Sequence, residues 1–303
     1  MSGRVIVLAG GTGGAKLARG MLDVVGEALT VVANTADDIE IYGAYVSPDP
    51  DLVTYWLADR IHERGWGLRD DTFAVMDGLR EIGADAWFAL GDRDLAIGIE
   101  RARRLAEGAR LTETAADLAR ALGVDARVLP MSDEAVRTWV KARGEWTPFQ
   151  EFMIRGGGQG PVQDTQLRGV GEALPTAEVL AEIAAARAIV IGPSNPVISI
   201  GPILTVPEMR QALIDSPAPI VAVSPIVGGD VLKGPTAAFM RWAGYDATTE
   251  AIAAGYAGLV DGLVADEPVA GLPVLQTDTL MSDAASRRRV AEQTLAFADG
   301  LAG

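Results

Sequence analysis

The feature that most constrains the fold of this chain is a short unit at its start. Residues 5–9 are an apolar run that leads into Gly10-Gly-Thr-Gly-Gly14, and an amphipathic stretch over residues 17–25 precedes a second apolar run at residues 29–33. Two buried strands joined by a helix within about 30 residues are typical of a βαβ unit with parallel strands. Parallel strands need helices on both faces of their sheet.

The rest of the chain repeats this alternation. Further short apolar runs occur at residues 86–90, 126–129, 188–191, 219–223 and 262–264. Amphipathic stretches lie between several of them, at residues 114–122, 176–186 and 207–214. The alternation predicts an α/β fold, Rossmann-like and doubly wound, with a mainly parallel sheet. We expect one domain over residues 1–303, with a helical excursion at about 94–125 and a β-hairpin insertion at about 136–160.

Composition excludes several classes of function. The chain has 303 residues, 41 acidic and 26 basic, and a formal net charge of −15, which disfavours nucleic acid as the main ligand. It has no cysteine and one histidine, so disulfides, thiolate nucleophiles and Cys- or His-rich metal sites are excluded. No apolar stretch approaches the roughly 18 residues of a membrane span, and the lead before the first strand is too short for a signal peptide. We expect a cytoplasmic protein without membrane contact.

The glycine-rich turn is the first candidate ligand site. Ligands of open parallel sheets bind beyond the carboxyl ends of the strands, where this turn is expected. Gly11, Thr12, Gly13 and Gly14 would let the backbone approach a phosphate, with Lys16 adding a positive charge. The motif matches neither the dinucleotide fingerprint nor the P-loop, so a tight turn without a ligand is the alternative.

Carboxylates gather after the second strand. Residues 34–38 read Asn-Thr-Ala-Asp-Asp, and residues 47–51 read Ser-Pro-Asp-Pro-Asp. Oxygen ligands of this kind suit Mg²⁺, which combines one or two carboxylates with phosphate oxygens and water. Asp37 and Asp51 are the predicted metal ligands and catalytic residues, while Asp38 and Asp49 are interpreted as turn or cap residues.

Two later segments complete the candidate site. Arg93 stands between two aspartates, Asp92 and Asp94, after the apolar run at residues 86–90, and either binds an anionic or planar ligand or is neutralised by its neighbours. Residues 191–204 join prolines and glycines to small polar residues. From that segment we expect a rigid nucleotide-binding loop formed by Ser194, Asn195 and Ser199.

Together these motifs resemble one family, the 2-phospho-L-lactate transferases. The chain shares with it, in order, GGTGGAKL at residues 10–17, NTADD at 34–38, SPDPD at 47–51, GDRDLA at 91–96, LPMSD at 129–133, FQEF at 149–152, GPSNPVISIGPIL at 192–204 and DTLM at 278–281. The resemblance runs from residue 4 to about 282. Leu52 and the Ile97-Gly98 pair depart from the family pattern, which usually has Thr and His at the corresponding places.

The resemblance implies a reaction. The family transfers a phospho-acyl group, derived from lactate, enolpyruvate or glycerate, from a guanosine diphosphate adduct to the ribityl hydroxyl of 8-hydroxy-5-deazariboflavin and releases GMP, in coenzyme F-420 biosynthesis. By motif, Asp51 and Arg93 match positions that contact the deazaflavin, and Asp37 and Asp51 match carboxylates near magnesium. The resemblance also implies a homodimer.

Two other functions share part of this sequence pattern. The related gluconeogenesis-factor family binds UDP-sugars without catalysis and shares the glycine-rich start, but it continues after its Asp-Asp with a Gly-Gly-Ser-Ser-type run, where this chain has Ile39-Glu-Ile-Tyr-Gly43. An NAD(P)-dependent oxidoreductase is suggested only by the glycine-rich turn. This chain lacks the third glycine of that motif and has Asn34 where an acidic residue is expected.

Overall fold

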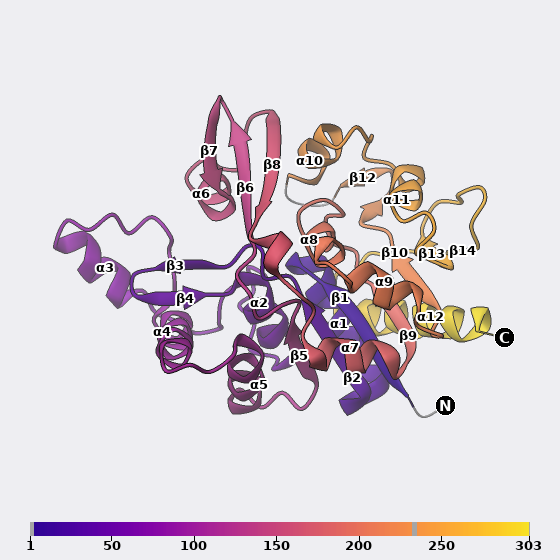
Figure 1. The fold of residues 1–303 in the computed structure, drawn as a ribbon, viewed down its shortest axis with the longest axis horizontal. Helices are drawn as coiled ribbons and strands as arrows, with labels where there is room; N and C mark the ends of the chain where they lie inside the picture. The colour runs from indigo at the N-terminus through magenta and orange to yellow at the C-terminus, as the bar shows by residue number, and fades with distance from the viewer. Residues whose placement is uncertain (1–2, 232–234, 303) are drawn as a thin grey trace.

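The computed structural model describes residues 3–231 and 235–302. Within them the chain folds around a seven-stranded sheet in which every neighbouring pair of strands is parallel (Figure 1). In spatial order the strands are β14 (Val274–Gln276), β13 (Gly262–Ala265), β10 (Ile220–Val223), β9 (Ala186–Ile191), β1 (Arg4–Ala9), β2 (Leu29–Ala33) and β5 (Arg127–Pro130). The predicted doubly wound α/β fold is confirmed.

Helices cover both faces of this sheet, because both faces of its strands are apolar. One face packs against α1 (Gly11–Val25), α2 (Pro48–Leu57), α5 (Leu111–Ala121) and α12 (Ala284–Leu301). The other packs against α7 (Ala177–Ala184), α8 (Ile200–Thr205), α9 (Met209–Ile214), α10 (Thr236–Trp242) and α11 (Thr249–Gly255). Among the described helices, none combines the length and apolar character that a membrane crossing requires.

Two excursions leave the sheet, one after β2 and one after β5. The first holds a hairpin of β3 (Ile39–Ile41) and β4 (Ala44–Val46), followed by α3 (Ala74–Glu81) and α4 (Asp92–Ala106). Together, α4 and α5 form the predicted helical excursion. The second is a three-stranded antiparallel sheet, β7-β6-β8, that stands above the main sheet with α6 (Phe149–Ile154) at its side (Figure 1). Its strands are β6 (Arg137–Ala142), β7 (Glu145–Pro148) and β8 (Val162–Arg168).

Three details differ from the sequence-based expectations. Residues 86–90 form no strand, because they pack into a separate apolar cluster with β3, β4 and α3 instead of joining the sheet. The predicted hairpin insertion has a third strand, β8, which pairs with β6, and its FQEF segment is helical. The sheet also gains the edge strand β14, which three residues specify too weakly to predict. Shorter elements are η1 (Gly26–Ala28), η2 (Val170–Glu172), β11 (Ile226–Val227) and β12 (Asp230–Val231).

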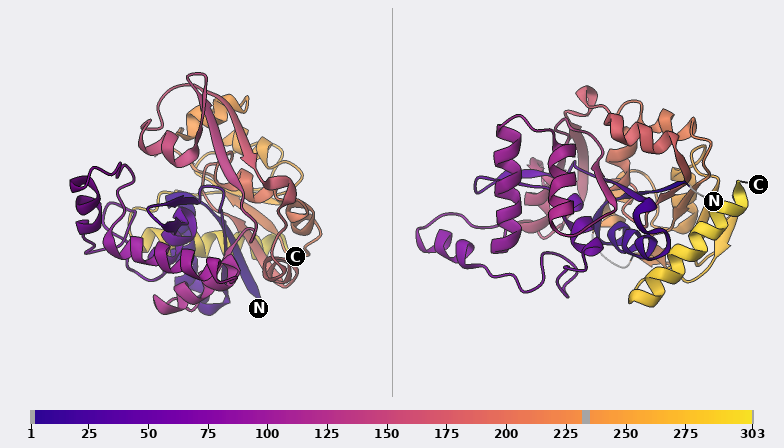
Figure 2. Two further views of the ribbon diagram at one scale, coloured as in Figure 1. Left: turned by 60° about the vertical axis from the view of Figure 1, so that its left-hand side comes forward. Right: turned by 90° about the horizontal axis from the view of Figure 1, so that it is seen from below.

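Helices α1 and α12 pack closely beside each other, as Figure 2 shows for the indigo and yellow helices. The contact depends on Gly20, because a Cβ atom there would lie 2.3 Å from the carbonyl oxygen of Arg287. Gly78, in the middle of α3, is a helical glycine that can serve as a control, because a Cβ atom added there would have no atom within 4 Å.

We therefore expect opposite effects from two identical substitutions. Gly20→Ala should lower the free energy of unfolding by about 1–3 kcal/mol, because the two helices must separate. Gly78→Ala should raise it by about 0.5–1 kcal/mol, because alanine loses less backbone entropy in a helix. Chemical denaturation of both variants measures the difference, and equal effects would contradict the close packing of α1 on α12.

Candidate active site

The site forms where the order of the strands reverses. From β1 the chain first adds β2 and β5 on one side and later adds β9, β10, β13 and β14 on the other, so the loops after β1 and β9 diverge at this point. Such a switch point creates a crevice at the carboxyl ends of the strands. The glycine-rich turn follows β1, and the segment with Ser194, Asn195 and Ser199 follows β9, so the fold brings these two predicted motifs together.

The two loops touch without space for side chains between them. A Cβ atom on Gly13 would lie 2.0 Å from the carbonyl oxygen of Pro193, and one on Gly14 would lie 2.7 Å from Oγ of Ser194. Gly11 adopts a positive φ of 63°. The glycines are therefore required by packing and backbone conformation, whether or not a phosphate binds.

Helix α1 begins at Gly11 and points its first turn into the crevice. Its N-cap, Gly10, provides no side-chain cap, and the N–H group of Gly11 donates to Oδ1 of Asp49 at 2.7 Å. The first N–H groups of a helix lack partners within the helix and favour negative charge. Gly11, Thr12 and Gly13 line the cavity in front of this helix end, which suits an anion.

A first cavity of about 600 Å³ occupies the crevice. It is lined by these predicted nucleotide-binding residues: Gly11, Thr12, Gly13, Lys16, Ser194, Asn195 and Ser199. Gly14 is buried behind them against Ser194. Within the described part of the chain, three buried polar atoms of lining residues have no hydrogen-bond partner: Oγ of Ser194, Oγ1 of Thr279 and Oδ1 of Asp37. A buried polar atom without a partner is available to bind a polar ligand, so these three are candidate contacts for one.

A second cavity, of about 390 Å³, adjoins the first and is different in character. Tyr55, Trp66, Trp87 and Phe88 line it, and the rings of Trp87 and Phe88 stack with centroids 5.6 Å apart. Leu52, one of the departures from the family pattern, is a further lining residue. Such a wall suits a flat, largely apolar ligand.

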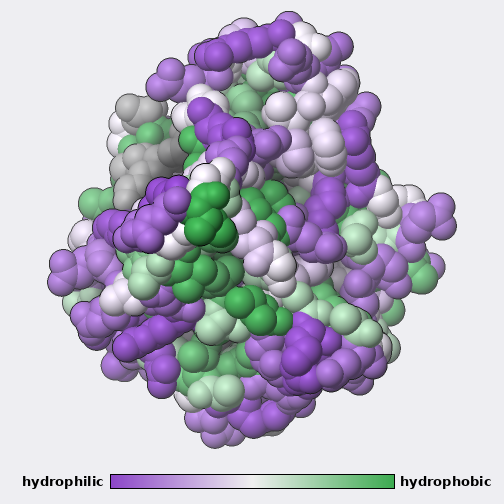
Figure 3. Space-filling view, turned by 90° about the vertical axis from the view of Figure 1, so that its left-hand side faces the viewer, coloured by the Kyte–Doolittle hydropathy of each residue, from purple (hydrophilic) through white to green (hydrophobic). Residues whose placement is uncertain are grey.

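Pro48, Asp49 and Gln150 line both cavities, so the two cavities meet at these residues. The side-chain amide of Gln150, on α6, donates to the backbone oxygen of Asp37 at 3.3 Å. Figure 3 views the molecule from the side that carries α3 and α4, and it shows apolar side chains gathered in the middle of this face within hydrophilic surroundings. Val75 in α3 and Ile82 at its end are exposed apolar residues of this side.

Three buried aspartates stand close together beside the first cavity. Burial raises the pKa of Asp37 well above its ordinary range, and the negative charges of Asp49 and Asp38 raise it further. Burial also raises the pKa of Asp49 to about 6 and that of Asp38 to about 7, although Arg137 counteracts the latter. Of these, Asp37 and Asp49 line the cavity. The cluster is a concentration of negative charge that a cation would relieve.

The SPDPD segment is the first turn of α2, where proline and aspartate are both favoured. Asp49 faces the first cavity, although the sequence suggested only a turn or cap role. Asp51 lines the second cavity, and both its oxygens accept hydrogen bonds from the buried guanidinium of Arg101. Sequence reasoning missed Arg101, whose signal is its place on the buried face of α4 after Leu95 and Gly98.

The side chains of Arg93 and its sequence neighbours, Asp92 and Asp94, have different surroundings. Arg93 is exposed at the start of α4 and lies outside the residues that line either cavity. Asp92 accepts hydrogen bonds from the backbone of Ala74 and Val75, and Asp94 accepts one from the hydroxyl of Tyr55 at 2.5 Å. The aspartates therefore have partners other than Arg93. Burial raises the pKa of Asp94, which lines the second cavity, to about 6.

Comparison with known proteins decides the family. The family described as "2-phospho-L-lactate transferase CofD" matches residues 5–290. The chain belongs to this family. It is 38% identical to the phosphoenolpyruvate transferase of Kitasatospora aureofaciens, with 98% of each chain covered, and 37% identical to the 2-phospho-L-lactate transferase of Methanopyrus kandleri, with 100% of each covered. A crystal structure of a UPF0052 family member from Bacillus halodurans shares the fold at a TM-score of 0.62 and 17% identity, covering 97% of this chain and 99% of that one.

Membership makes the chain a transferase, and it bears on the metal prediction. In the described part of the transferase, no group of three or more acidic or histidine side chains is arranged to hold a metal ion. Asp37, whose Oδ1 has no partner among the described residues, still fits Mg²⁺, which commonly binds one or two carboxylates together with substrate phosphates. Both oxygens of the neighbouring Asp49 accept hydrogen bonds, from the N–H of Gly11 and the side-chain amide of Asn34. Asp51, the other predicted ligand, uses both oxygens for Arg101.

The raised carboxyl pKa values make stability depend on pH. With a pKa of about 7 for Asp38 in the folded state and about 3.9 in the unfolded chain, the folded state binds the extra proton between these values. Stability from this group is therefore lost as pH rises from about 4 to about 7. In the absence of metal, Asp38→Asn should be more stable than the wild type at pH 8 by about 1–3 kcal/mol, and the difference should vanish near pH 4.

Denaturation of the two proteins at each pH measures this difference, which includes the effect on Asp37, because the charge of Asp38 raises the pKa of that neighbour. Asp246→Asn, which removes an exposed charge, is the control and should give no comparable trend. A difference between wild type and Asp38→Asn that is constant from pH 4 to pH 8 would contradict the assigned burial of charge.

Proposed function

We propose that this transferase moves a phospho-acyl group from a guanosine diphosphate-linked donor to the ribityl hydroxyl of 8-hydroxy-5-deazariboflavin and releases GMP, in coenzyme F-420 biosynthesis. The observation that carries the proposal is the meeting of two unlike cavities at Pro48, Asp49 and Gln150. One cavity has the backbone and hydroxyl groups that bind phosphates, and the other has an aromatic wall for a flat ring system. Relatives named for phospholactate and phosphoenolpyruvate transfer support an acyl group of this kind.

The donor fits the first cavity. Its diphosphate would accept hydrogen bonds from the first turn of α1 and from Ser194 and Thr279, whose hydroxyls lack partners in the part of the chain that the structure describes. Lys16, whose Nζ also donates to the backbone oxygen of Met281 at 3.0 Å, brings a positive charge to the same cavity. Asn195 and Ser199 complete the lining on the side of β9.

Mg²⁺, when bound, would neutralise charge on the donor phosphates. We propose Asp37 as its ligand, with Asp49 facing the same space, because their crowded negative charges and the free Oδ1 of Asp37 suit a cation. A direct bond from Asp51 to the metal stays a prediction. So does the role of Arg93 in acceptor binding.

The acceptor fits the second cavity, with its ring system against Trp87 and Phe88 and its ribityl chain directed to the junction. Asp51 lines this cavity and would orient the attacking hydroxyl by accepting its hydrogen bond. The hydroxyl oxygen forms a bond to the phosphorus that carries the acyl group. The bond from that phosphorus to the bridging oxygen breaks, GMP leaves with the electron pair, and the hydroxyl proton passes to Asp51 or to water.

The first test is a transfer assay. Purified protein with Mg²⁺ and the deazaflavin should release GMP from at least one of the lactyl, enolpyruvyl and glyceryl donors, because the two cavities bring donor and acceptor together. GDP with Mg²⁺ should also raise Tm, since a ligand that binds only the folded state stabilises it. A rise in Tm with UDP-N-acetylglucosamine alone, without GMP release from any donor, would favour the non-catalytic gluconeogenesis-factor alternative. The homodimer and the cytoplasmic location stay predictions.

The two cavities should respond separately to substitution. Trp87→Leu removes part of the aromatic wall, so the KM for the deazaflavin should rise about tenfold, the lower part of the range for lost ring stacking. Ser194→Ala removes a hydroxyl that has no partner among the described residues, so the KM for the donor should rise about three- to tenfold while Tm stays unchanged.

Steady-state kinetics with each substrate varied in turn measures both effects, and each variant is the control for the other. Trp87→Leu should leave the KM for the donor within about twofold of wild type, and Ser194→Ala should do the same for the acceptor. If both variants raise the same KM, the assignment of donor and acceptor to separate cavities is wrong.

A further inference from the structure

Arg101 is a fully buried cation behind the second cavity. Its side chain is 3% exposed, and the side chain of its partner, Asp51, is 10% exposed. Nη1 donates to Oδ2 of Asp51 at 3.0 Å and to the backbone oxygen of Tyr45 at 2.9 Å, and Nη2 donates to Oδ1 of Asp51. Asp51 lines the cavity and Arg101 does not.

Several contacts of α4 fix the position of this guanidinium. Gly98, one turn earlier on α4, lets the helix lie against β4, where a Cβ atom would come within 3.1 Å of Cβ of Ala44. The far end of α4 is tied to α5 by the ion pair of Arg104 with Asp117.

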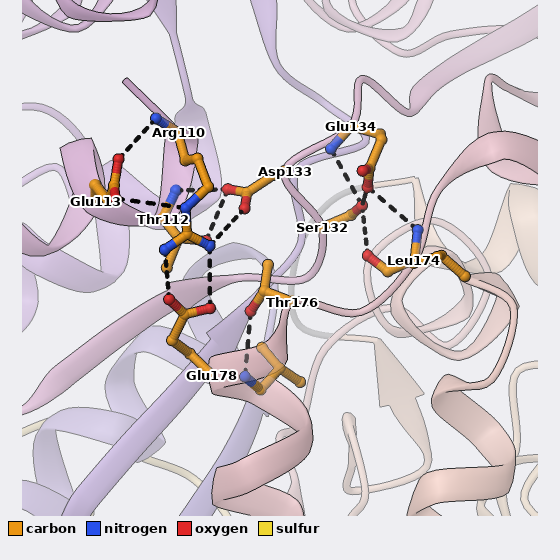
Figure 4. Close-up of polar contacts among 10 residues, drawn as sticks. Arg110, Thr112, Glu113, Ser132, Asp133, Glu134, Leu174, Thr176 and Glu178 are labelled. Atoms are coloured by element: carbon orange, nitrogen blue, oxygen red, sulfur yellow. Dashed lines mark hydrogen bonds and ion pairs between the residues drawn. The ribbon is translucent and has the colours of Figure 1, made fainter. Parts of the chain in front are cut away.

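Helix α5 is in turn fastened to the body of the protein, as Figure 4 shows. Oδ1 of Asp133 accepts hydrogen bonds from the backbone and hydroxyl of Thr112 at 2.7 and 2.8 Å. Arg110 pairs with both Asp133 and Glu178, which is on α7. This accounts for the LPMSD segment, which lines neither cavity but anchors the helices that carry Arg101.

Stability alone explains the pair poorly, because a buried ion pair adds little stability relative to apolar residues of similar size. A bidentate guanidinium does, however, fix a carboxylate in both direction and rotation. We propose that Arg101 is a positioning residue that holds the carboxylate of Asp51 in the orientation needed to receive the hydroxyl of the acceptor. This inference rests on the proposed function for the identity of the acceptor.

The test uses Arg101→Lys, which keeps the charge but loses the bidentate geometry. The kcat/KM for the deazaflavin should fall about tenfold or more, while the KM for the donor stays within about twofold. Arg103→Lys is the matched control on the same helix, because Arg103 forms exposed pairs with Glu100 and Glu107, and it should behave as wild type. An Arg101→Lys enzyme with lower Tm but unchanged kinetics toward the acceptor would overturn the inference.

A second comparison covers the case in which Arg101→Lys does not fold. Asp51→Asn with Arg101→Gln removes both charges together, so it leaves no unpaired buried charge. If Arg101 acts only through Asp51, this double variant and Asp51→Asn alone should have the same kcat/KM for the acceptor. A further loss of fivefold or more in the double variant, at equal Tm, would show an independent role and overturn the inference.

A crystal structure of the Arg101→Lys protein separates this inference from the proposed function. If the wild type neither binds nor converts the deazaflavin, the proposed function fails, but the position of the Asp51 carboxylate still decides the matter. A rotated or disordered carboxylate supports positioning by Arg101. A carboxylate unmoved from its wild-type orientation contradicts it.

Discussion

The contact between the loops after β1 and β9 is the constraint on which the rest of the site depends. The strands that carry these loops are neighbours at the reversal of strand order, and the glycines let the two backbones approach until no side chain fits between them. This closeness places the end of α1 opposite Ser194 and makes one wall of the first cavity from two segments nearly 200 residues apart in the sequence. A side chain at Gly13 would therefore force the two loops apart and change the shape of the cavity, even without touching a ligand.

The same geometry explains the electrostatics. Asp49 accepts a hydrogen bond from Gly11 at the positive end of α1 and another from Asn34, which partly offset the effect of its burial. The side chains of Thr138 and Asn34 also oppose the rise in the pKa of Asp37, but its burial and the negative charges of Asp49 and Asp38 outweigh them. Natural proteins commonly carry such locally unfavourable groups where they bind ligands, and the strong apolar packing on both faces of the sheet tolerates them.

The sequence predicted the parts whose signals are local. Strands such as β1 and β9 are continuous apolar runs, and motifs directly after them had to lie at one edge of the sheet. Strand predictions failed where the outcome depends on tertiary partners. Residues 86–90 have strand-like composition but pack in a separate apolar cluster, and β14 was missed because it is only three residues long. Arg101 was missed because one charged residue on a buried helix face looks like a surface residue until its partner is located.

Asp49 shows the opposite difficulty, since its cap-like hydrogen bond to Gly11 is real and yet its carboxylate also faces the cavity. No sequence pattern separates these two roles, because both require an aspartate near a helix end.

Helix α6 has a consequence for how the two cavities communicate. It supplies Gln150 to both linings, Met153 to one and Ile154 to the other, so this six-residue helix forms part of the wall that the two cavities share. A displacement of α6 would change the shape of both cavities at once. If a ligand in one cavity displaces α6, its binding is linked to binding in the other cavity, and the linkage is reciprocal: whatever factor the first ligand contributes to the affinity of the second, the second contributes to the first.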